Sequence, residues 1–461
     1  MSQNPRQLAF LTLKSIDRGA FADIALDQVL NQAELSDLDR RLLTELVYGC
    51  VRRQRTLDAL IDQLGKKPSQ HQPPNLRLIL HLGLYQLRYL THMPPSAAVN
   101  TTVDLAKQNG FAGLSGVVNG LLRQYIRLTR SAEVSLSSAS PSLAAPTDPL
   151  QLPSDPIAQL GILHSYPDWI VQVWLEQFGW EATAQLCAWM NQPPPIDLRI
   201  NPLKTSLEQV IAAFTAQGIA LQQVGSCPQA LRLMQPVGAI QALPGFDQGW
   251  WMVQDSSAQL VSHLLNPQPG EVVIDACAAP GGKTAHIAEL MGDRGIIWAC
   301  DKTPSRLKKL RQNCDRLGLQ SIRIHTGDSR QNPEFVGLAD RVLLDAPCSG
   351  LGTLHRHADA RWRQTPERVQ ELVQLQAELL QQAVTWVKPG GTLVYATCTL
   401  HPAENEQLIT AFLAQQPAWK IVPPAPNTPP AAYALPQGWI KVLPVQHHMD
   451  GFFMVQLQQT R

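Results

Sequence analysis

The sequence predicts a multidomain protein whose N-terminal region is all-α and whose C-terminal region is a doubly wound α/β sheet, with a small α/β module between them. Two observations support this fold class. Apolar side chains recur at helical spacing through residues 1–130, whereas apolar runs of strand length alternate with amphipathic helices from about residue 261. The length of 461 residues also requires two or three domains.

The composition excludes several classes of protein. Hydrophobic residues make up 44% of the chain and charged residues 16%, which is enough apolar material for sizeable cores. No apolar run approaches the roughly 18 residues that a membrane-spanning helix needs, and the first residues lack a secretory apolar segment. The eight cysteines include no C-x-x-C pair, so neither a disulfide framework nor a zinc site is predicted. We therefore expect a cytoplasmic protein with no membrane anchor and no metal.

Basic residues are concentrated near the N-terminus. Residues 1–130 carry 16 Lys and Arg against 10 Asp and Glu, a balance of +6, whereas residues 151–260 carry 3 against 8, a balance of −5. The first balance suits an anionic partner such as nucleic acid, although a solvated helical surface explains it equally well. The arginines that could hold phosphates are Arg40, Arg41, Arg52, Arg53, Arg55, Arg123, Arg127 and Arg130.

Helix signals in the N-terminal region are specific. Ser36 and Asp39 form an N-cap signal ahead of the apolar residues at 42–47. Three stretches, "LSDLDRRLLTELVYGCVRRQRTLDALID", "LRLILHLGLYQLRYLTHMPPSAAVNTTVDLAK" and "GVVNGLLRQ", resemble the NusB-like RNA-binding helical domain. That family usually has Glu where this chain has Thr101 or Thr102. The resemblance implies that the all-α region is a NusB-like domain that binds RNA.

The clearest domain boundary is a stretch rich in serine, alanine and proline. Residues 131–150 contain six Ser, four Ala and three Pro without periodicity, which is typical of a flexible linker. The predicted segments are a helical domain at 1–130, a linker at 131–155, a small α/β module at 156–260 and an α/β domain at 261–461.

The small module alternates helix-like and strand-like pieces, including a strand at 197–201 and a helix at 206–218. These pieces are consistent with an RNA-recognition-like module. Its acidity argues against a role as the main phosphate contact. Trp250 and Trp251 are interpreted as core or domain-interface residues rather than as platforms for base stacking.

The C-terminal domain places polar side chains where its predicted strands end. Strands are predicted at 271–275, 295–300, 321–326, 340–345, 391–397, 419–423 and 451–457, with helices at 304–317 and 366–387. The candidate residues at or just after strand ends are Asp275, Asp301, Asp328, Asp345, Cys348 and Cys398. Because ligands bind beyond the carboxyl ends of parallel strands, we expect these side chains to share one edge of the sheet.

The first of these strands runs into a tight loop. Its glycines permit close approach of a ligand, and the helix start behind them suits an anionic group. A Walker A phosphate loop needs glycine at the position of Cys277, and no G-x-G-x-x-G fingerprint is present. We therefore predict that the loop binds the carboxylate of a nucleoside-bearing amino acid. The loop consists of Cys277, Ala278, Ala279, Pro280, Gly281, Gly282 and Lys283.

Two aspartates complete the prediction of a cofactor. Asp301 follows the loop by about 20 residues and could hold a ribose diol, while Asp328 could accept a hydrogen bond from an adenine amino group. A helix N-cap is the structural alternative for each aspartate taken singly. Taken together with the loop, they predict S-adenosyl-L-methionine.

Cys348 and Cys398 predict the reaction. A thiol near a helix N-terminus has a lowered pKa and is a good nucleophile. Methylation at C5 of a pyrimidine needs a thiolate at C6, and a second thiol can assist release, so the pair suits this cycle whichever cysteine attacks. Asp345 could contact the base edge or the sulfonium region. Cysteines expected as buried filler are Cys50, Cys187, Cys227, Cys300 and Cys314.

Three motifs resemble the RNA (cytosine-5) methyltransferases: "DACAAPGGKTAHIAELM", "DRVLLDAPCSGLGTLHRHADARWR" and "YATCTLHPAENE". With the NusB-like N-terminus, the resemblance is to the bacterial 16S ribosomal RNA branch of that family. It implies a Rossmann-like methyltransferase domain that uses S-adenosyl-L-methionine. We expect small-subunit ribosomal RNA, naked or in early assembly, as the partner of a monomer.

The resemblance also implies roles for single residues. Cys398 becomes the nucleophile and Cys348 assists product release. Residues assigned to the cofactor are Cys277 to Lys283, Asp301, Asp328 and Asp345. The chain departs from the usual pattern at Thr399, where Ser is usual, and at Ala358, where Pro is common.

Basic residues near the site divide into two groups. Arg356, His357, Arg361 and Arg363 follow the Cys348 loop and are expected along the path of an RNA whose target base is extruded. A solvated surface is expected for Lys302, Arg306, Lys308, Lys309 and Arg311. Two alternative functions remain open: the same chemistry on transfer RNA or 23S ribosomal RNA, and a non-catalytic RNA-binding factor of the antitermination type.

Overall fold

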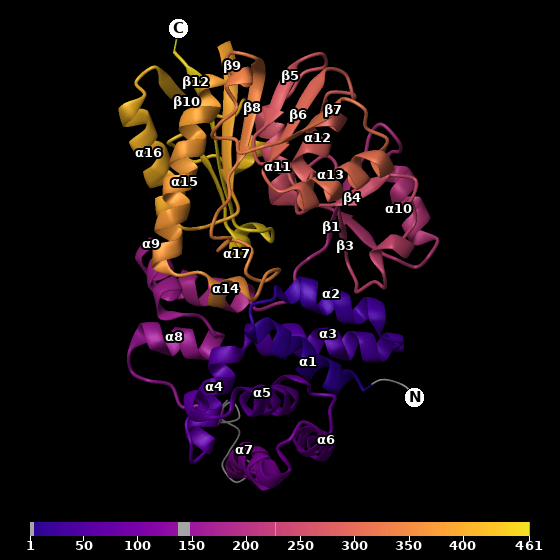
Figure 1. The fold of residues 1–461 in the computed structure, drawn as a ribbon, viewed down its shortest axis with the longest axis vertical. Coiled ribbons are helices and arrows are strands. Elements are labelled where there is room, and N and C mark those ends of the chain that lie inside the picture. Colours follow the sequence, from indigo (N-terminus) through magenta and orange to yellow (C-terminus); the bar gives the residue numbers. More distant parts are fainter. Residues whose placement is uncertain (1–3, 137–147, 226, 461) are drawn as a thin grey trace. The chain divides into compact units, whose positions relative to one another are not determined.

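The structure, a computed structural model, describes residues 4–136, 148–225 and 227–460 and divides the chain into two compact units (Figure 1). The first unit combines Met1–Asn191 with a short later segment, Leu354–Arg363. The second unit contains Gln192–Thr353 and Gln364–Arg461. The boundary between these units at residue 191 falls within the segment predicted as a small module at 156–260, whose first two helices group with the helical unit.

Helices form the first unit, as the apolar spacing predicts. Ser36 accepts a hydrogen bond from Asp39 N at 3.2 Å, which confirms the predicted N-cap. Prolines occupy the first turns of two later helices, where the missing N–H has no cost. The helices are α1 (Pro5–Asp17), α2 (Ala22–Gln32), α3 (Asp37–Arg52), α4 (Gln54–Leu64), α5 (Pro74–Tyr89), α6 (Pro95–Gln108), α7 (Ser115–Leu136), α8 (Pro156–His164), α9 (Asp168–Trp189) and α14 (Ala360–Arg363).

The end of the helical domain differs from the prediction. Helix α7 passes the expected boundary at residue 130 and ends at Leu136, and residues 137–147 lie outside the described part of the chain. Asp148 then accepts a hydrogen bond from Arg88 Nη1 at 2.6 Å. The segment predicted as a linker therefore begins as a helix, and its last residues pack against the helical unit.

A small antiparallel sheet opens the second unit, in the order β2-β3-β1-β4. Helix α10 (Leu207–Thr215) packs on it and begins with a capping box of Ser206 and Gln209. Trp251 is fully buried and Trp250 packs against the same core, which confirms the prediction that both are core residues. The strands are β1 (Asp197–Ile200), β2 (Leu221–Gln223), β3 (Ala230–Leu233) and β4 (Trp251–Val253).

A second sheet carries the candidate residues, in the order β10-β12-β9-β8-β5-β6-β7 with β11 paired to β12. Strands β7, β6, β5, β8 and β9 pair in parallel, and β10, β11 and β12 add an antiparallel edge. All predicted strands are present, and β11 was not predicted. The strands are β5 (Val272–Asp275), β6 (Ile296–Asp301), β7 (Ile322–Thr326), β8 (Ala339–Asp345), β9 (Val387–Thr397), β10 (Trp419–Val422), β11 (Ile440–Val442) and β12 (Phe452–Gln459).

Helices cover both faces of this sheet (Figure 1). Successive residues of β8 face opposite sides: Val342 and Leu344 pack beneath α15 and α16, whereas Leu343 packs beneath α11 and α12. The chain order reverses between β5 and β8, which is the switch point where such sheets bind ligands. The helices are α11 (Ser256–Leu265), α12 (Gly282–Leu290), α13 (Pro304–Leu317), α15 (Pro366–Thr385), α16 (Glu406–Gln415) and α17 (Pro444–His447).

Candidate active site

The carboxyl ends of β5, β6 and β8 bring the predicted residues to one edge of the sheet. Asp275, Asp301 and Asp345 are the last residues of these strands. Lys283, in the first turn of α12, donates to Asp345 Oδ2 at 2.6 Å and interacts electrostatically with Cys398 after β9. The structure therefore gathers the loop, the carboxyl groups and the thiols, as the predicted strand ends require.

Helix α12 begins directly at the glycine loop. Gly281 has a φ of +103°, which L side chains rarely adopt, and a Cβ there would lie 2.7 Å from Leu310 Cγ. Ala278 N donates to Cys300 O at 2.8 Å and so ties the loop to the end of β6. The first N–H groups of a helix have no acceptor within the helix, so this loop presents donors to an anion such as an amino-acid carboxylate.

Asp275 is a buried carboxyl group at the end of β5. Thr284 Oγ1 donates to its Oδ2 at 2.7 Å, whereas Oδ1 is buried without a hydrogen-bond partner among the described residues. Burial raises the pKa of Asp275 to about 7. Asp275 is only 1% exposed, so it holds the first turn of α12 through Thr284.

We expect Asp275 to make the stability of the free protein depend on pH. Its folded-state pKa lies above the ordinary value of 3.8, so the unfolded chain releases the proton at lower pH and stability falls as pH rises towards 7. The loss between about pH 5 and pH 8 should be about 3 kcal/mol. Thermal unfolding of the wild type and of Asp275→Asn at these two pH values measures the loss of stability. An equal loss in both proteins would contradict this assignment.

Asp301 and Asp328 already have partners that a nucleoside would have to share or replace. Asp301 is 5% exposed, and its carboxyl oxygens accept from Thr303 N at 2.7 Å and lie 3.2 Å from Arg306. Arg306 is exposed, and it also donates to Ala279 O in the glycine loop at 2.5 Å. A bidentate hydrogen bond from Arg330 lowers the pKa of Asp328 to about 2. Both carboxyl groups thus offer acceptors that suit hydroxyl and amino donors.

The two thiols meet at the same edge, with the sulfur atoms of Cys348 and Cys398 3.4 Å apart. The hydrogen bond with Cys398 and burial raise the pKa of Cys348 well above its ordinary value, so the prediction of a lowered pKa is wrong for this thiol. Burial is the largest single influence on the pKa of Lys283 and lowers it, but the charge of Asp345, its hydrogen bond and smaller electrostatic contributions from Cys398 and Asp275 together make the net shift upward. Lys283 therefore keeps its positive charge beside Cys398.

The five cysteines predicted as filler are buried, which confirms that prediction. They are Cys50, Cys187, Cys227, Cys300 and Cys314. Cys277, in the glycine loop, is partly exposed, and burial raises its pKa well above the ordinary value, which disfavours its thiolate.

A buried carboxyl group that the sequence analysis did not single out joins the two cysteine loops. Glu404 is fully buried and accepts from Ser349 N and from Gln376 Nε2, each at 2.9 Å, and from Ser349 Oγ. Ser349 directly follows one catalytic candidate, and Thr399, 2.8 Å from its hydroxyl, directly follows the other. Burial raises the pKa of Glu404. The motif "YATCTLHPAENE" contains this residue, but its partners are distant in sequence.

Replacing Glu404 by glutamine should slow the chemistry without weakening cofactor binding. The NH2 group of a glutamine would face the N–H and O–H groups of Ser349 and Gln376, which now donate to the carboxylate. Disturbing a buried hydrogen bond in this way costs about 1–3 kcal/mol. We expect a single-turnover methylation rate reduced about tenfold or more. Glu406→Gln, which alters the ion pair with Lys441, is the matched control. Equal rates for the two variants would remove Glu404 from this role.

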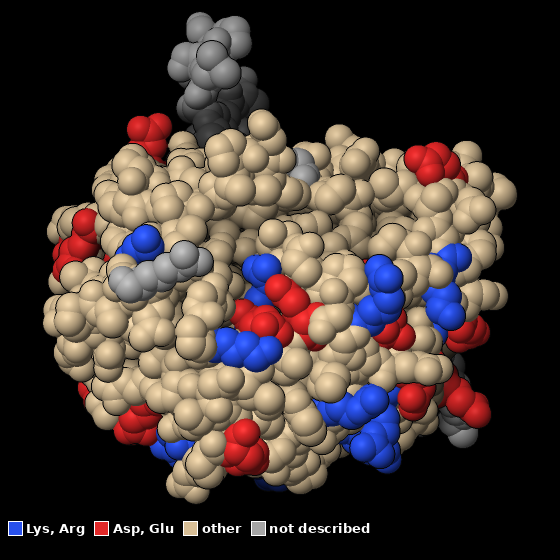
Figure 2. All heavy atoms as spheres, turned by 90° about the horizontal axis from the view of Figure 1, so that it is seen from above, with Lys and Arg blue, Asp and Glu red and all other residues tan. Residues whose placement is uncertain are grey.

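Several N-terminal arginines predicted to hold phosphates have structural partners instead. Arg40 donates to Leu30 O at 2.8 Å, and Arg55 pairs with Asp168 at 2.6 Å. The exposed members of the group are Arg41, Arg123 and Arg127, and the side chain of Arg130 lies outside the described residues. Figure 2 views the protein from the top of Figure 1, so it shows the second unit and not these arginines; on that face Lys and Arg lie among Asp and Glu.

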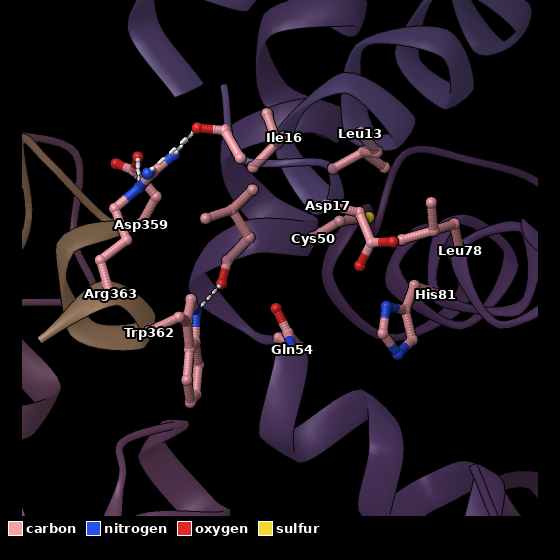
Figure 3. A pocket seen from close by; sticks show the side chains of 12 residues that line it. Leu13, Ile16, Asp17, Cys50, Gln54, Leu78, His81, Asp359, Trp362 and Arg363 are labelled. Carbon is pink, nitrogen blue, oxygen red and sulfur yellow. Dashed lines mark hydrogen bonds and ion pairs between the residues drawn. The ribbon is translucent and has the colours of Figure 1, made fainter. Parts of the chain in front are cut away.

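The segment Leu354–Arg363, which follows the Cys348 loop in the chain, is built into the helical unit. Arg361 is fully buried and donates to Asn191 Oδ1 at 3.0 Å. Trp362 Nε1 donates to Val51 O at 2.7 Å (Figure 3). Trp362 and neighbouring residues line a pocket of about 290 Å³ within this unit.

These contacts correct the prediction for Arg361 and Arg363, two of the four residues expected along the path of RNA. Arg361 is buried, and Arg363 donates to Gly19 O at 3.2 Å and to Ala20 O, so neither side chain is placed to receive phosphate. Their surroundings come from the first helices, which a local sequence motif does not reveal. The second basic group is exposed as predicted: Lys302, Arg306, Lys308, Lys309 and Arg311.

Among the described residues, no helix is long and apolar enough to span a bilayer. The same residues contain no cluster of His, Cys, Asp and Glu that could hold a metal ion.

Comparisons with known proteins agree with this arrangement. Residues 3–127 match the NusB family, residues 166–240 match a ferredoxin-like domain of RsmF/B-like methyltransferases, and residues 262–458 match the family described as 16S rRNA methyltransferase RsmB/F. A probable ribosomal RNA small subunit methyltransferase B of Synechocystis is 50% identical over 460 residues, covering 99% of each chain. The chain belongs to the RsmB/F family of 16S rRNA methyltransferases.

Other members and structures support the assignment to this family. A probable ribosomal RNA small subunit methyltransferase B of Bacillus subtilis is 34% identical and covers 98% of each chain. The crystal structure of a methyltransferase homologue from Pyrococcus horikoshii has a TM-score of 0.58 and 28% identity, covering 67% of this chain and all of that one. Family membership confirms the predicted enzyme class, a ribosomal RNA methyltransferase, and the NusB-like and Rossmann-like domains.

Proposed function

We propose that the protein transfers a methyl group from S-adenosyl-L-methionine to C5 of one cytosine in 16S ribosomal RNA, through a covalent bond between Cys398 and C6. The contact of 3.4 Å between the sulfurs of Cys348 and Cys398, beside the cofactor loop, carries this proposal. A single nucleophilic thiol would suffice for attack, whereas a second thiol at this distance suits a cycle that must also undo the adduct.

The cofactor supplies an electrophilic methyl group when bound. The residues assigned to it are Cys277 to Lys283, Asp301, Asp328 and Asp345, with loop N–H groups for the carboxylate, Asp301 for the ribose and Asp328 for the adenine. Lys283 Nζ donates to Asp345 at 2.6 Å, and this ion pair holds the carboxylate beside the proposed reaction site.

The thiols act in sequence. The Cys398 thiolate bonds to C6, and the electron pair of the C5–C6 double bond moves to C5, which becomes the nucleophilic carbon. After C5 has been methylated, its proton must leave, the double bond forms again and the Cys398–C6 bond breaks, which regenerates the thiolate. Lys283 stabilises the thiolate at the beginning and at the end of this cycle.

Cys348 is assigned the removal of the C5 proton. Its hydrogen bond with Cys398 is the largest cause of its raised pKa, so Cys348 stays a neutral thiol while Cys398 is free. When Cys398 is bonded to the base, that cause is lost, although burial still raises the pKa of Cys348. Cys348 then gives up its proton to solvent and accepts the proton from C5. One proton is released overall for each methyl group transferred.

A labelled-methyl transfer assay tests the proposed substrate. Purified protein is incubated with labelled S-adenosyl-L-methionine and, separately, with naked 16S ribosomal RNA, early-assembly particles, 23S ribosomal RNA and transfer RNA. We expect label in 16S ribosomal RNA as 5-methylcytidine after digestion to nucleosides. Incorporation into transfer RNA or 23S ribosomal RNA in its place would favour the alternative substrates, and no incorporation into any RNA would support a non-catalytic RNA-binding factor.

A further inference from the structure

The small antiparallel sheet contributes a buried arginine to the cofactor loop. Arg199 lies on β1, and its side chain is 0% exposed. Its Nε and Nη2 donate to the two carboxylate oxygens of Glu289 on α12, at 2.9 and 2.7 Å. This bidentate pair connects the small sheet to the helix that begins at the cofactor loop.

The same guanidinium reaches the loop itself. Arg199 Nη1 donates to Gly282 O at 2.6 Å and also to Gln254 Oε1. Gly282 is the first residue of α12 and directly follows Gly281, whose positive φ suits glycine. The amide of Gln254 also packs against the loop: its nitrogen lies 3.5 Å from the place that a Cβ on Gly282 would occupy.

A second polar contact holds the same helix. His286 on α12 is fully buried, and its Nε2 lies 2.8 Å from Gln229 Oε1, just before β3. Burial lowers the pKa of His286 well below its ordinary value, so the ring is neutral. Polar side chains from the small sheet therefore fix α12 at its first residue and along its buried face.

Stability alone does not explain this network. A buried ion pair is expensive to desolvate, and apolar residues of similar size are often as stable or more stable in its place. Directional hydrogen bonds instead define one position and orientation for the group that they hold. The group held here is the carbonyl of the first helical residue behind the cofactor loop.

We propose that the small α/β module, besides any contact with RNA, orients the cofactor loop, and that Arg199 is the positioning residue. Arg199 acts through Gly282 O and Glu289 to keep the N–H groups of the loop in the geometry that binds the methionine end of S-adenosyl-L-methionine. This inference rests on the proposed function, because it names the cofactor that the loop holds.

Arg199→Lys, in the full-length protein, is the first test. A lysine keeps a positive charge for Glu289 but lacks the planar fork that serves Glu289, Gln254 and Gly282 together. We expect S-adenosyl-L-methionine to bind about tenfold or more weakly by calorimetry, with the KM for the cofactor raised and the KM for RNA unchanged. Arg232→Lys is the matched control, since Arg232 makes a similar bidentate pair with Asp197 on the same sheet. Its cofactor affinity should equal that of the wild type.

A double variant separates positioning from stability. Arg199→Met combined with Glu289→Leu removes both buried charges, so no unpaired carboxylate is left to unfold the protein. We expect wild-type-like thermal unfolding with the same loss of cofactor affinity. Wild-type affinity in either Arg199 variant would overturn the inference. Failure of the wild type itself to bind S-adenosyl-L-methionine would instead overturn the proposed function, so the two failures are distinguishable.

Discussion

Cys398→Ala should form no covalent complex with RNA, whereas Cys348→Ala should accumulate one. Without the Cys398 thiolate nothing attacks C6, so both the adduct and the methylated product are absent. Without Cys348 the attack still occurs, but the C5 proton is not removed efficiently and the bond to C6 persists. Denaturing gel electrophoresis of each variant with 16S ribosomal RNA and S-adenosyl-L-methionine measures the adduct.

Methylation should fall by about 10³-fold or more for Cys398→Ala, since loss of a covalent nucleophile leaves only positioning and binding. Cys314→Ala, a thiol of α13 expected as filler, is the control and should methylate RNA like the wild type. If Cys398→Ala trapped RNA and Cys348→Ala were inactive without an adduct, the roles of the two thiols would be exchanged.

Asp301→Ala should weaken S-adenosyl-L-methionine binding by about tenfold to a hundredfold, because it removes charged hydrogen-bond acceptors proposed to hold the ribose diol. The carboxyl group is 5% exposed at the end of β6, and its present contacts are with Thr303 N and Arg306. Calorimetry of the full-length protein with the cofactor gives the affinity directly, without RNA.

Asp315→Ala is the comparison for this measurement, since Asp315 is an exposed residue of the helix that follows Asp301. Its affinity should match the wild type. An unchanged affinity for Asp301→Ala would remove this aspartate from the cofactor site and leave it as a cap of the turn before α13.

Strand ends could be predicted from the sequence because each carries a local signal. An apolar run that stops at Asp275, Asp301 or Asp345 fixes the end of a strand, and the parallel order then places these ends together. The alternation of faces in β8 and the glycine loop before α12 follow from equally local patterns. The two catalytic candidates were found in the same way.

Residues that act through distant partners could not be predicted. Glu404 meets Ser349, 55 residues earlier, and Arg199 meets Glu289, 90 residues later. Nothing in the sequence near either residue indicates these contacts, because they depend on how separate elements pack. Arg361 was misinterpreted for the same reason. Its position beside the Cys348 motif suggested a contact with RNA, yet helices distant in sequence bury its side chain.

The raised pKa of Cys348 has a similar origin. Its position after Pro347 in a strand-end turn suggested an activated thiol, but the pKa of a thiol depends on its neighbours in space. The sulfur of Cys398 and burial together raise the pKa of Cys348. The raised pKa supports different proposed roles for the two cysteines: Cys398 attacks C6, and Cys348 removes the C5 proton.

Mapping 5-methylcytosine in 16S ribosomal RNA shows whether the protein methylates a single cytosine. Bisulfite sequencing compares RNA from cells that contain the protein, lack it, or carry Cys398→Ala. The account predicts one cytosine that resists conversion only when the wild-type protein is present. An identical pattern in all three strains, or a methyl group on a different base, would contradict it.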